Sequence, residues 1–132
     1  MSIMFRPLTR GFRGRTVLRV VHHVSPSASL TLACALADLP RGAARRLLLE
    51  PPVTVFHTDD GELLAIDDTC THQEASLADG WLEGCSIECP LHAAIFDLRT
   101  GEPDGLLARE PVRTHRVVVQ DGGVYVAIGE RP

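Results

Sequence analysis

The sequence has 132 residues, enough for one small domain with a single hydrophobic core. Its thirteen basic residues are all arginine, and seventeen acidic residues give a formal charge of −4. Residues 1–37 hold five arginines and no acid, whereas the remainder holds eight arginines and seventeen acids, a net charge of −9. This acidic balance argues against nucleic-acid binding. No apolar run approaches the twenty residues of a membrane span.

The first part of the chain differs in composition from the rest. Residues 1–31 contain arginine, serine and proline but no acidic residue, and Arg19, His22 and His23 interrupt any apolar signal core. We therefore expect residues 1–31 to be a disordered, arginine-rich N-terminal extension and residues 32–130 to form the domain.

From residue 32 onward, short apolar segments alternate with turns, a pattern typical of antiparallel β structure. Asp59-Asp60-Gly61 and Asp121-Gly122-Gly123 have the composition of tight hairpin turns. One helical turn is expected within residues 74–79. The predicted strands cover residues 31–36, 45–49, 53–58, 62–67, 85–88, 94–98, 116–120 and 124–128.

Two mixed pairs of cysteine and histidine dominate the middle of the chain. Cys70-Thr71-His72 is followed, after residues 73–88, by Cys89-Pro90-Leu91-His92. Two thiolates and two imidazoles suit a [2Fe–2S] cluster with both cysteines on one iron and both histidines on the other. Replacing two thiolates by neutral imidazoles removes negative charge, which raises the reduction potential from roughly −400 mV to about −150 to +300 mV.

The surrounding residues resemble the Rieske family, and more narrowly the soluble Rieske-type ferredoxins of bacterial ring-hydroxylating dioxygenase systems. The resemblance covers about residues 32 to 129. It is carried by the runs AIDDTCTHQE (65–74), DGWLEG (79–84), ECPLH (88–92) and FDLRTG (96–101). It implies an all-β fold, a Rieske-type antiparallel β-sandwich with a small cluster-binding subdomain on two loops. We expect Trp81 to pack beneath that subdomain.

The resemblance also implies a function. One [2Fe–2S] cluster per chain would be held by Cys70, His72, Cys89 and His92, and no residue would be catalytic. The protein would be a soluble, cytoplasmic electron carrier and a monomer. It would take single electrons from an NAD(P)H-dependent flavoprotein ferredoxin reductase and pass them to a terminal Rieske oxygenase, a non-haem iron enzyme. His72 and His92 would form the edge of the cluster where electrons leave, which we call the histidine edge. Gln73, Glu74 and Leu91 border this edge and are candidates for docking.

Some positions depart from the high-potential members of the family. Ala75 and Leu91 stand where those relatives have a pair of disulfide-bonded cysteines, and Ala93-Ala94-Ile95 offers the cluster no hydroxyl group. Fewer hydrogen bonds to the sulfurs predict a potential near the low end of the family range. We expect Cys34 and Cys85 to be small core residues, which favours a reducing compartment.

Two alternative functions remain open at this point. The small subunit of an assimilatory nitrite reductase shares the fold, although members of that group often lack the ligands. A zinc-stabilised domain that mediates assembly is a non-redox alternative, but zinc sites usually pair cysteine with cysteine and histidine with histidine. Of the other histidines, His57 is expected on the surface and His115 in strand packing. None forms the spaced set that a mononuclear iron site needs.

Overall fold

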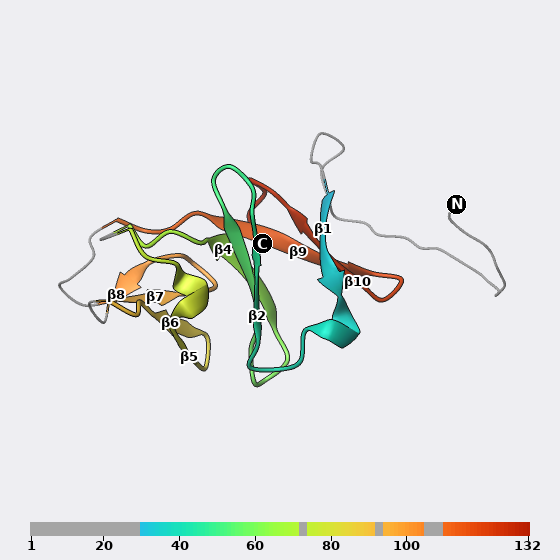
Figure 1. Ribbon diagram of the computed structural model, residues 1–132, viewed down its shortest axis with the longest axis horizontal. Coiled ribbons are helices and arrows are strands. Elements are labelled where there is room, and N and C mark those ends of the chain that lie inside the picture. The colour runs from blue at the N-terminus through green and yellow to red at the C-terminus, as the bar shows by residue number, and fades with distance from the viewer. Residues whose placement is uncertain (1–29, 72–73, 92–93, 105–109) are drawn as a thin grey trace, which may run out of the picture.

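The computed structural model describes residues 30–71, 74–91, 94–104 and 110–132. All the described strands belong to two antiparallel sheets, and the only other regular elements in this part of the chain are two short 3₁₀ helices (Figure 1). The elements in chain order are β1 (Leu30–Ala35), η1 (Leu36–Asp38), β2 (Ala44–Leu47), β3 (Val53–His57), β4 (Leu63–Asp67), η2 (Leu77–Asp79), β5 (Trp81–Glu83), β6 (Ser86–Glu88), β7 (Ile95–Asp97), β8 (Pro103–Asp104), β9 (Thr114–Gln120) and β10 (Gly123–Ala127).

The larger sheet has six strands in the order β1-β10-β9-β4-β3-β2. β1 and β2 stand at opposite ends of this order and yet contact each other. The sheet therefore curls on itself, and its two halves enclose a core to which β1, β3, β4 and β10 contribute. The buried residues of this core, which we call the sandwich core, are Cys34, Leu39, Val53, Val55, Ala65, Val124 and Val126. This is the predicted antiparallel β-sandwich.

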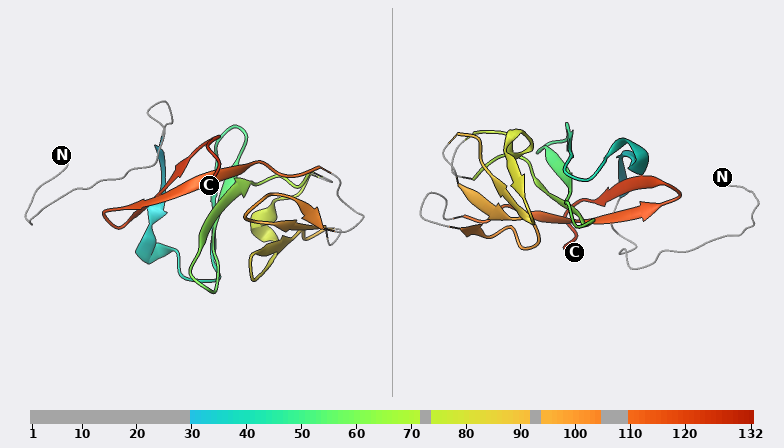
Figure 2. Two further views of the ribbon diagram at one scale, coloured as in Figure 1. Left: turned by 180° about the vertical axis from the view of Figure 1, so that it is seen from behind. Right: turned by 90° about the horizontal axis from the view of Figure 1, so that it is seen from below.

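The smaller sheet has four strands in the order β5-β6-β7-β8 and lies at one end of the molecule, opposite β1 and β10 (Figures 1 and 2). Its inner face packs against β3 and β4 of the larger sheet. The buried residues of this second core, which we call the loop core, are Phe56, Leu64, Ile66, Cys70, Leu77, Ile87, Cys89, Ala94, Phe96, Leu98 and Val112.

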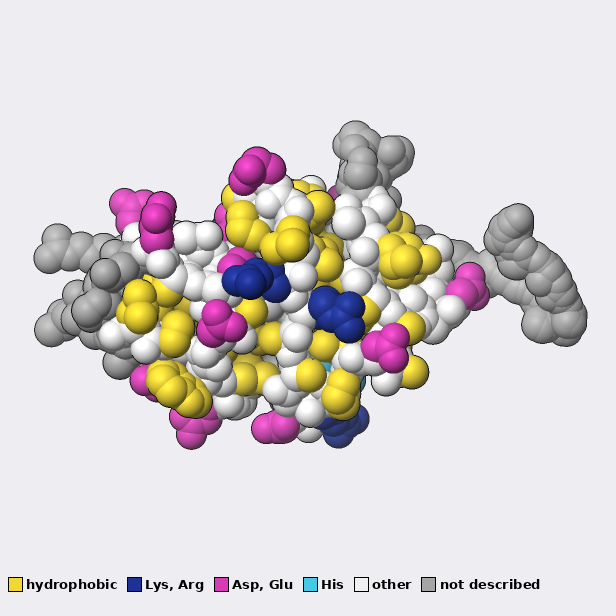
Figure 3. All heavy atoms as spheres, in the orientation of Figure 1, with side chains coloured by type: hydrophobic (Ala, Val, Ile, Leu, Met, Phe, Trp, Pro, Cys, Tyr) yellow, Lys and Arg dark blue, Asp and Glu magenta, His cyan; other side chains and the backbone are white. Residues whose placement is uncertain are grey.

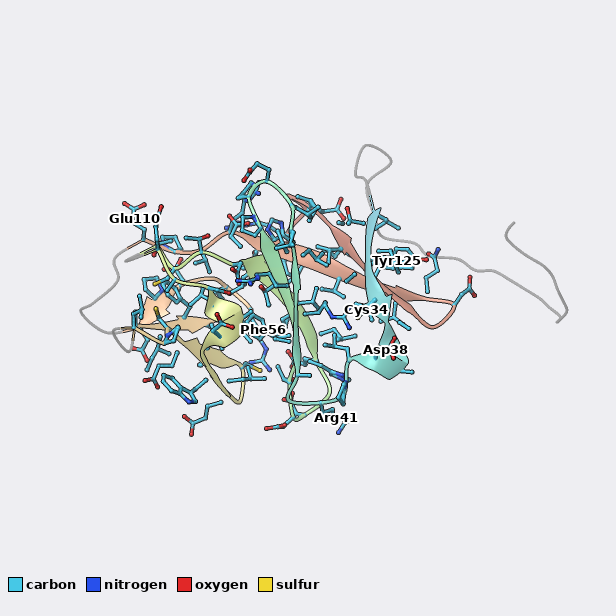
Figure 4. The ribbon with its side chains drawn as sticks, viewed as in Figure 1. Cys34, Asp38, Arg41, Phe56, Glu110 and Tyr125 are labelled. Atoms are coloured by element: carbon cyan, nitrogen blue, oxygen red, sulfur yellow. The ribbon has the colours of Figure 1, made fainter. Side chains whose placement is uncertain are left out.

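The strands β3 and β4 are covered on both faces, which explains why most of their residues are buried, the polar Thr54 included. Along β3, Val55 points into the sandwich core and Phe56 into the loop core. Along β4, Ala65 points into the sandwich core and Ile66 into the loop core. In Figure 4, Phe56 and Cys34 lie on opposite sides of β2. β3 and β4 thus lie between the sandwich core and the loop core, and the loop core supports the small sheet.

All eight predicted strands are present, with ends shifted by at most about two residues, a usual uncertainty in strand assignment. The hairpin turn at residues 121–123 joins β9 to β10, and the predicted helical turn appears as η2. Strands β5 and β8 escaped prediction because three and two residues are too short to show an alternating pattern. The three-residue strands β6 and β7 were predicted because their segments stand on either side of the Cys89–His92 motif. No helix in the described ranges is long and apolar enough to cross a membrane. β1 begins at Leu30, before the expected start of the domain at residue 32. The expected boundary stays a prediction.

Candidate metal centre

Two loops at the end of the molecule that carries the small sheet hold the motif cysteines. The first loop, residues 70–75, follows β4, and the second, residues 89–94, joins β6 to β7. Both loops close in the same way. The Cys70 N–H donates to the carbonyl of Ala75 at 3.0 Å, and the Cys89 N–H donates to the carbonyl of Ala94 at 2.6 Å. In each loop the cysteine is therefore fixed at the base, bonded to the residue five positions further on.

Both cysteines are buried in the same core. Cys70 is 3% exposed and Cys89 is fully buried, and each belongs to the loop core. Leu91, two residues beyond Cys89, is 55% exposed. The second loop therefore keeps its thiol at the base while its tip reaches the solvent. A pair of buried thiols on matching loops provides the sulfur half of the donor set that a cluster with two cysteine ligands needs.

The two motif histidines, His72 and His92, lie outside the described residues. So does Gln73, one of the residues expected at the histidine edge. The other two residues of that edge are on the surface, since Leu91 and Glu74 are both exposed. The assignment of the histidines as ligands stays a prediction.

A buried carboxylate holds the base of the first loop. Asp68 is 3% exposed, and its Oδ1 accepts three hydrogen bonds. The donors are the Thr54 hydroxyl at 2.6 Å, the Ser76 hydroxyl at 2.9 Å and the Ala78 N–H at 3.1 Å. Its Oδ2 lies 3.7 Å from the guanidinium of Arg46. Asp68 thus ties the segment before Cys70 to β2, to β3 and to the segment after the loop.

The backbone of Asp68 also helps to hold the base of the first loop. Its carbonyl accepts from the Leu77 N–H at 2.7 Å, and its N–H donates to the Pro52 carbonyl at 2.9 Å. An isolated bridge pairs Thr69 with Ser76 directly below the loop. Sequence reasoning overlooked Asp68, since an aspartate beside a turn is ordinary and its partners come from distant parts of the chain.

The first loop is tied to a third segment by the residue between its two motif positions. The Thr71 hydroxyl donates to the carbonyl of Glu110 at 2.7 Å. Glu110 lies at the end of the molecule that carries the small sheet (Figure 4). The hydroxyl proton of Thr71 is therefore committed to a backbone carbonyl. Sequence reasoning gave no role to this residue, and only its place inside the motif could have drawn attention to it.

The other two cysteines lie elsewhere. Cys34 is buried in the sandwich core, and Cys85 packs at the margin of the loop core beside Glu62. Burial raises the pKa of the Cys85 thiol, so this sulfur is protonated at neutral pH. The Glu62 carboxylate is bound by Arg99, with Nε 3.0 Å from Oε1, and this contact lowers the pKa of Glu62. The ion pair joins the turn after β7 to the start of β4.

The expectation for Trp81 was wrong. The side chain does not pack beneath the subdomain but is 61% exposed at the start of the edge strand β5. The alternation of the strand turns Leu82 inward against the loop core, which sends Trp81 and Glu83 outward. The size of the side chain suggested burial, but the register of a strand that the sequence did not reveal decided its direction.

The remaining described histidines are engaged in structural contacts. His115 is fully buried in β9, as expected. Its Nδ1 accepts from the Gly129 N–H at 2.8 Å, so Nε2 carries the proton and donates to Asp67 Oδ1 at 2.8 Å. His57 is only partly exposed, with Nδ1 2.7 Å from the Leu39 carbonyl. The expectation of a surface position for His57 was therefore only partly right.

Comparison with known proteins adds to this geometry. Residues 29–128 match the family described as the Rieske [2Fe–2S] domain. The 3-phenylpropionate/cinnamic acid dioxygenase ferredoxin subunit of Photorhabdus laumondii is 44% identical over 103 residues, which are 77% of this chain and 97% of the relative.

Solved structures of other proteins also match this chain. The ferredoxin in a complex of reduced oxygenase and oxidized ferredoxin in carbazole 1,9a-dioxygenase superposes with a TM-score of 0.69 at 39% identity. The match covers 73% of this chain and 99% of that one. A putative NADH-dependent nitrite reductase small subunit from Mycobacterium tuberculosis matches with a TM-score of 0.68 at 23% identity over 75% of this chain and 94% of that one. That likeness extends to the fold alone.

Proposed function

Because this chain belongs to the Rieske [2Fe–2S] domain family, we propose that it carries single electrons from a flavoprotein reductase to a terminal ring-hydroxylating oxygenase. It is an electron-transfer component of a dioxygenase system rather than a catalytic enzyme. The observation that carries this function is the pair of buried cysteines, Cys70 and Cys89, at the bases of two identically closed loops in one core. The nitrite reductase alternative has the weaker support, since that likeness is one of fold.

In this proposal Cys70 and Cys89 bind one iron, and His72 and His92 bind the other. The cluster supplies a one-electron store with a potential between about −150 and +300 mV. The residues around it hold the thiols away from water and fix the loops. We place the potential near the low end of the range, because Ala94 offers no hydroxyl and the Thr71 hydroxyl donates to Glu110 instead.

The partners follow from the same reasoning. The matched relatives are subunits of dioxygenase systems, which supports a terminal oxygenase as the electron acceptor. An NAD(P)H-dependent flavoprotein reductase is the electron donor that such a carrier needs, and we propose that the carrier acts as a monomer in the cytoplasm. Cys34 and Cys85 form no disulfide, which fits a reducing compartment.

Electron paramagnetic resonance on anaerobically purified protein tests the proposal. We expect the oxidised protein to be silent and the dithionite-reduced protein to give a rhombic signal with the low average g of mixed cysteine and histidine ligation. Two iron atoms per chain should accompany it. Stoichiometric zinc with no signal would instead leave the fold intact and remove the electron-transfer function.

A further inference from the structure

The outer face of the small sheet combines one exposed aromatic ring with acidic side chains. Strands β5, β6 and β7 alternate, so that Leu82, Ile87 and Phe96 point inward to the loop core. The residues between them point away from this core. We call the following set the acidic face: Trp81, Glu83, Glu88, Asp97 and Asp104.

The register of the strands brings these side chains together. Trp81 pairs directly with Glu88, Glu88 with Ile95, and Ile95 with Asp104, which forms one row across all four strands. Glu83, Ser86 and Asp97 form the neighbouring row. Directly paired side chains have Cβ atoms about 4.5–5.5 Å apart. Trp81 is therefore flanked by one carboxylate across the ladder and by another two residues along its own strand.

No arginine or lysine neutralises this face from within its own strands. The face carries four carboxylates, those of Glu83, Glu88, Asp97 and Asp104. Arg99, two residues after Asp97, is bound to Glu62, the residue before β4. In Figure 3, acidic and hydrophobic atoms lie side by side over the region of β5, and the arginine atoms visible in this view lie over the larger sheet.

We propose that the acidic face is a docking surface for a redox partner protein whose contact surface carries arginine side chains, with one of them stacked on the ring of Trp81. The proposal rests on the proposed function, since it concerns how the carrier meets its partner. A guanidinium over an indole ring gains a cation–π attraction, and tryptophan and arginine are the residues that most often dominate protein interfaces. Glu88 immediately precedes Cys89, so a partner bound here lies beside the second loop.

Charge decides between this occupant and a second copy of the chain. Two copies that met through this face would bring like charges together, which is unfavourable, whereas a basic surface gains attraction and a faster encounter. Complex formation should therefore weaken as the salt concentration rises.

Trp81 is the only tryptophan of the chain, which allows a direct test. Protein labelled with 5-fluorotryptophan gives a single ¹⁹F resonance that the partner's own tryptophans do not obscure. The probes are the purified oxygenase and flavoprotein reductase components of a 3-phenylpropionate/cinnamic acid dioxygenase system, each at a concentration at which it exchanges electrons with the wild-type protein. We expect at least one component to shift or broaden the resonance at low salt. In 0.5 M salt, where the Debye length is on the order of a few ångströms, the resonance should return to its position in the free protein.

Variants separate docking from folding. Trp81→Ala should raise the apparent KM for that component at least about tenfold, as expected for an interface hot spot. The double variant Glu83→Gln/Glu88→Gln should raise the same apparent KM at low salt only. The matched controls are Leu48→Ala, which removes another exposed apolar side chain, and Glu50→Gln/Asp121→Asn, which removes two exposed charges elsewhere. Both controls should behave as wild type, and all variants should keep the wild-type paramagnetic signal.

Several outcomes would overturn the inference. A resonance that neither component moves, together with wild-type KM values for the Trp81 and double-glutamine variants, excludes docking at this face. A resonance that moves with protein concentration in the absence of a partner indicates self-association through this face. Absence of the cluster signal in the wild-type protein would instead overturn the proposed function, which the paramagnetic measurement reports separately.

Discussion

At the scale of single residues, Asp68 shows how one buried side chain can organise a site from outside it. Three donors converge on its Oδ1, and they come from β3, from the end of the first loop and from η2. Moving this carboxylate away would leave buried donors without acceptors. An aspartate that accepts several hydrogen bonds is therefore held in place more firmly than a residue that is held by packing alone.

Replacing this residue gives a matched pair of variants. Asp68→Ala removes the acceptor and leaves the buried Thr54 hydroxyl unsatisfied, so we expect a loss of about 1–3 kcal/mol of stability and faster loss of cluster absorbance. Asp68→Asn keeps an oxygen in place and should be milder. Thermal unfolding and the visible spectrum over time measure both effects. Equal behaviour of the two variants would show that the three hydrogen bonds are not what holds the loop.

The ligand assignment is also tested at one residue. His92→Cys adds a thiolate to the set and restores negative charge, so the potential should fall towards roughly −400 mV, or the cluster should fail to assemble. Spectroelectrochemical titration measures the change. An assembled cluster with the wild-type potential would contradict the assignment of His92.

At the scale of elements, the small sheet depends on a close approach between η2 and β6. A Cβ built on Gly80 would lie 2.0 Å from the carbonyl oxygen of Glu88, the residue before Cys89. Only glycine allows the chain to pass there, because any side chain would meet backbone atoms that cannot move aside cheaply.

Gly80→Ala should therefore destabilise the protein by about 1–3 kcal/mol, in the range of overpacked sites. The control is Gly84→Asn in the β5–β6 turn. Nothing lies within 4 Å of a Cβ at Gly84, and asparagine tolerates its φ of +59°. Denaturant unfolding compares the two. A Gly80→Ala protein as stable as wild type would show that β6 can shift without cost.

At the scale of the whole molecule, the described strands from Leu30 onward form both sheets, with one core inside the curled larger sheet and the loop core between the two sheets. β1 pairs with β10 and forms one edge of the larger sheet, so Leu30 to Ala35 belong to the fold.

Removal of residues 1–28 should accordingly leave the cluster signal and the melting temperature unchanged. Removal of residues 1–36 also deletes β1 and uncovers Val124 and Val126 of the sandwich core, and it should lower the melting temperature. Calorimetry and the reduced-state paramagnetic signal measure both proteins. Loss of the cluster in the shorter deletion would show that the extension supports the fold.

The sequence by itself determined the family, the cofactor and eight of the ten described strands, because ligand spacing, turn residues and hydrophobic alternation are local properties of the chain. The tertiary structure decided what depends on distant partners. Asp68 gains its role only when β2, β3 and η2 meet around it. Trp81 faces the solvent because its strand pairs with β6 in a register that turns Leu82 inward. The charge of an acidic body was visible in the composition, but its gathering around one exposed ring required the cross-strand pairing of four short strands.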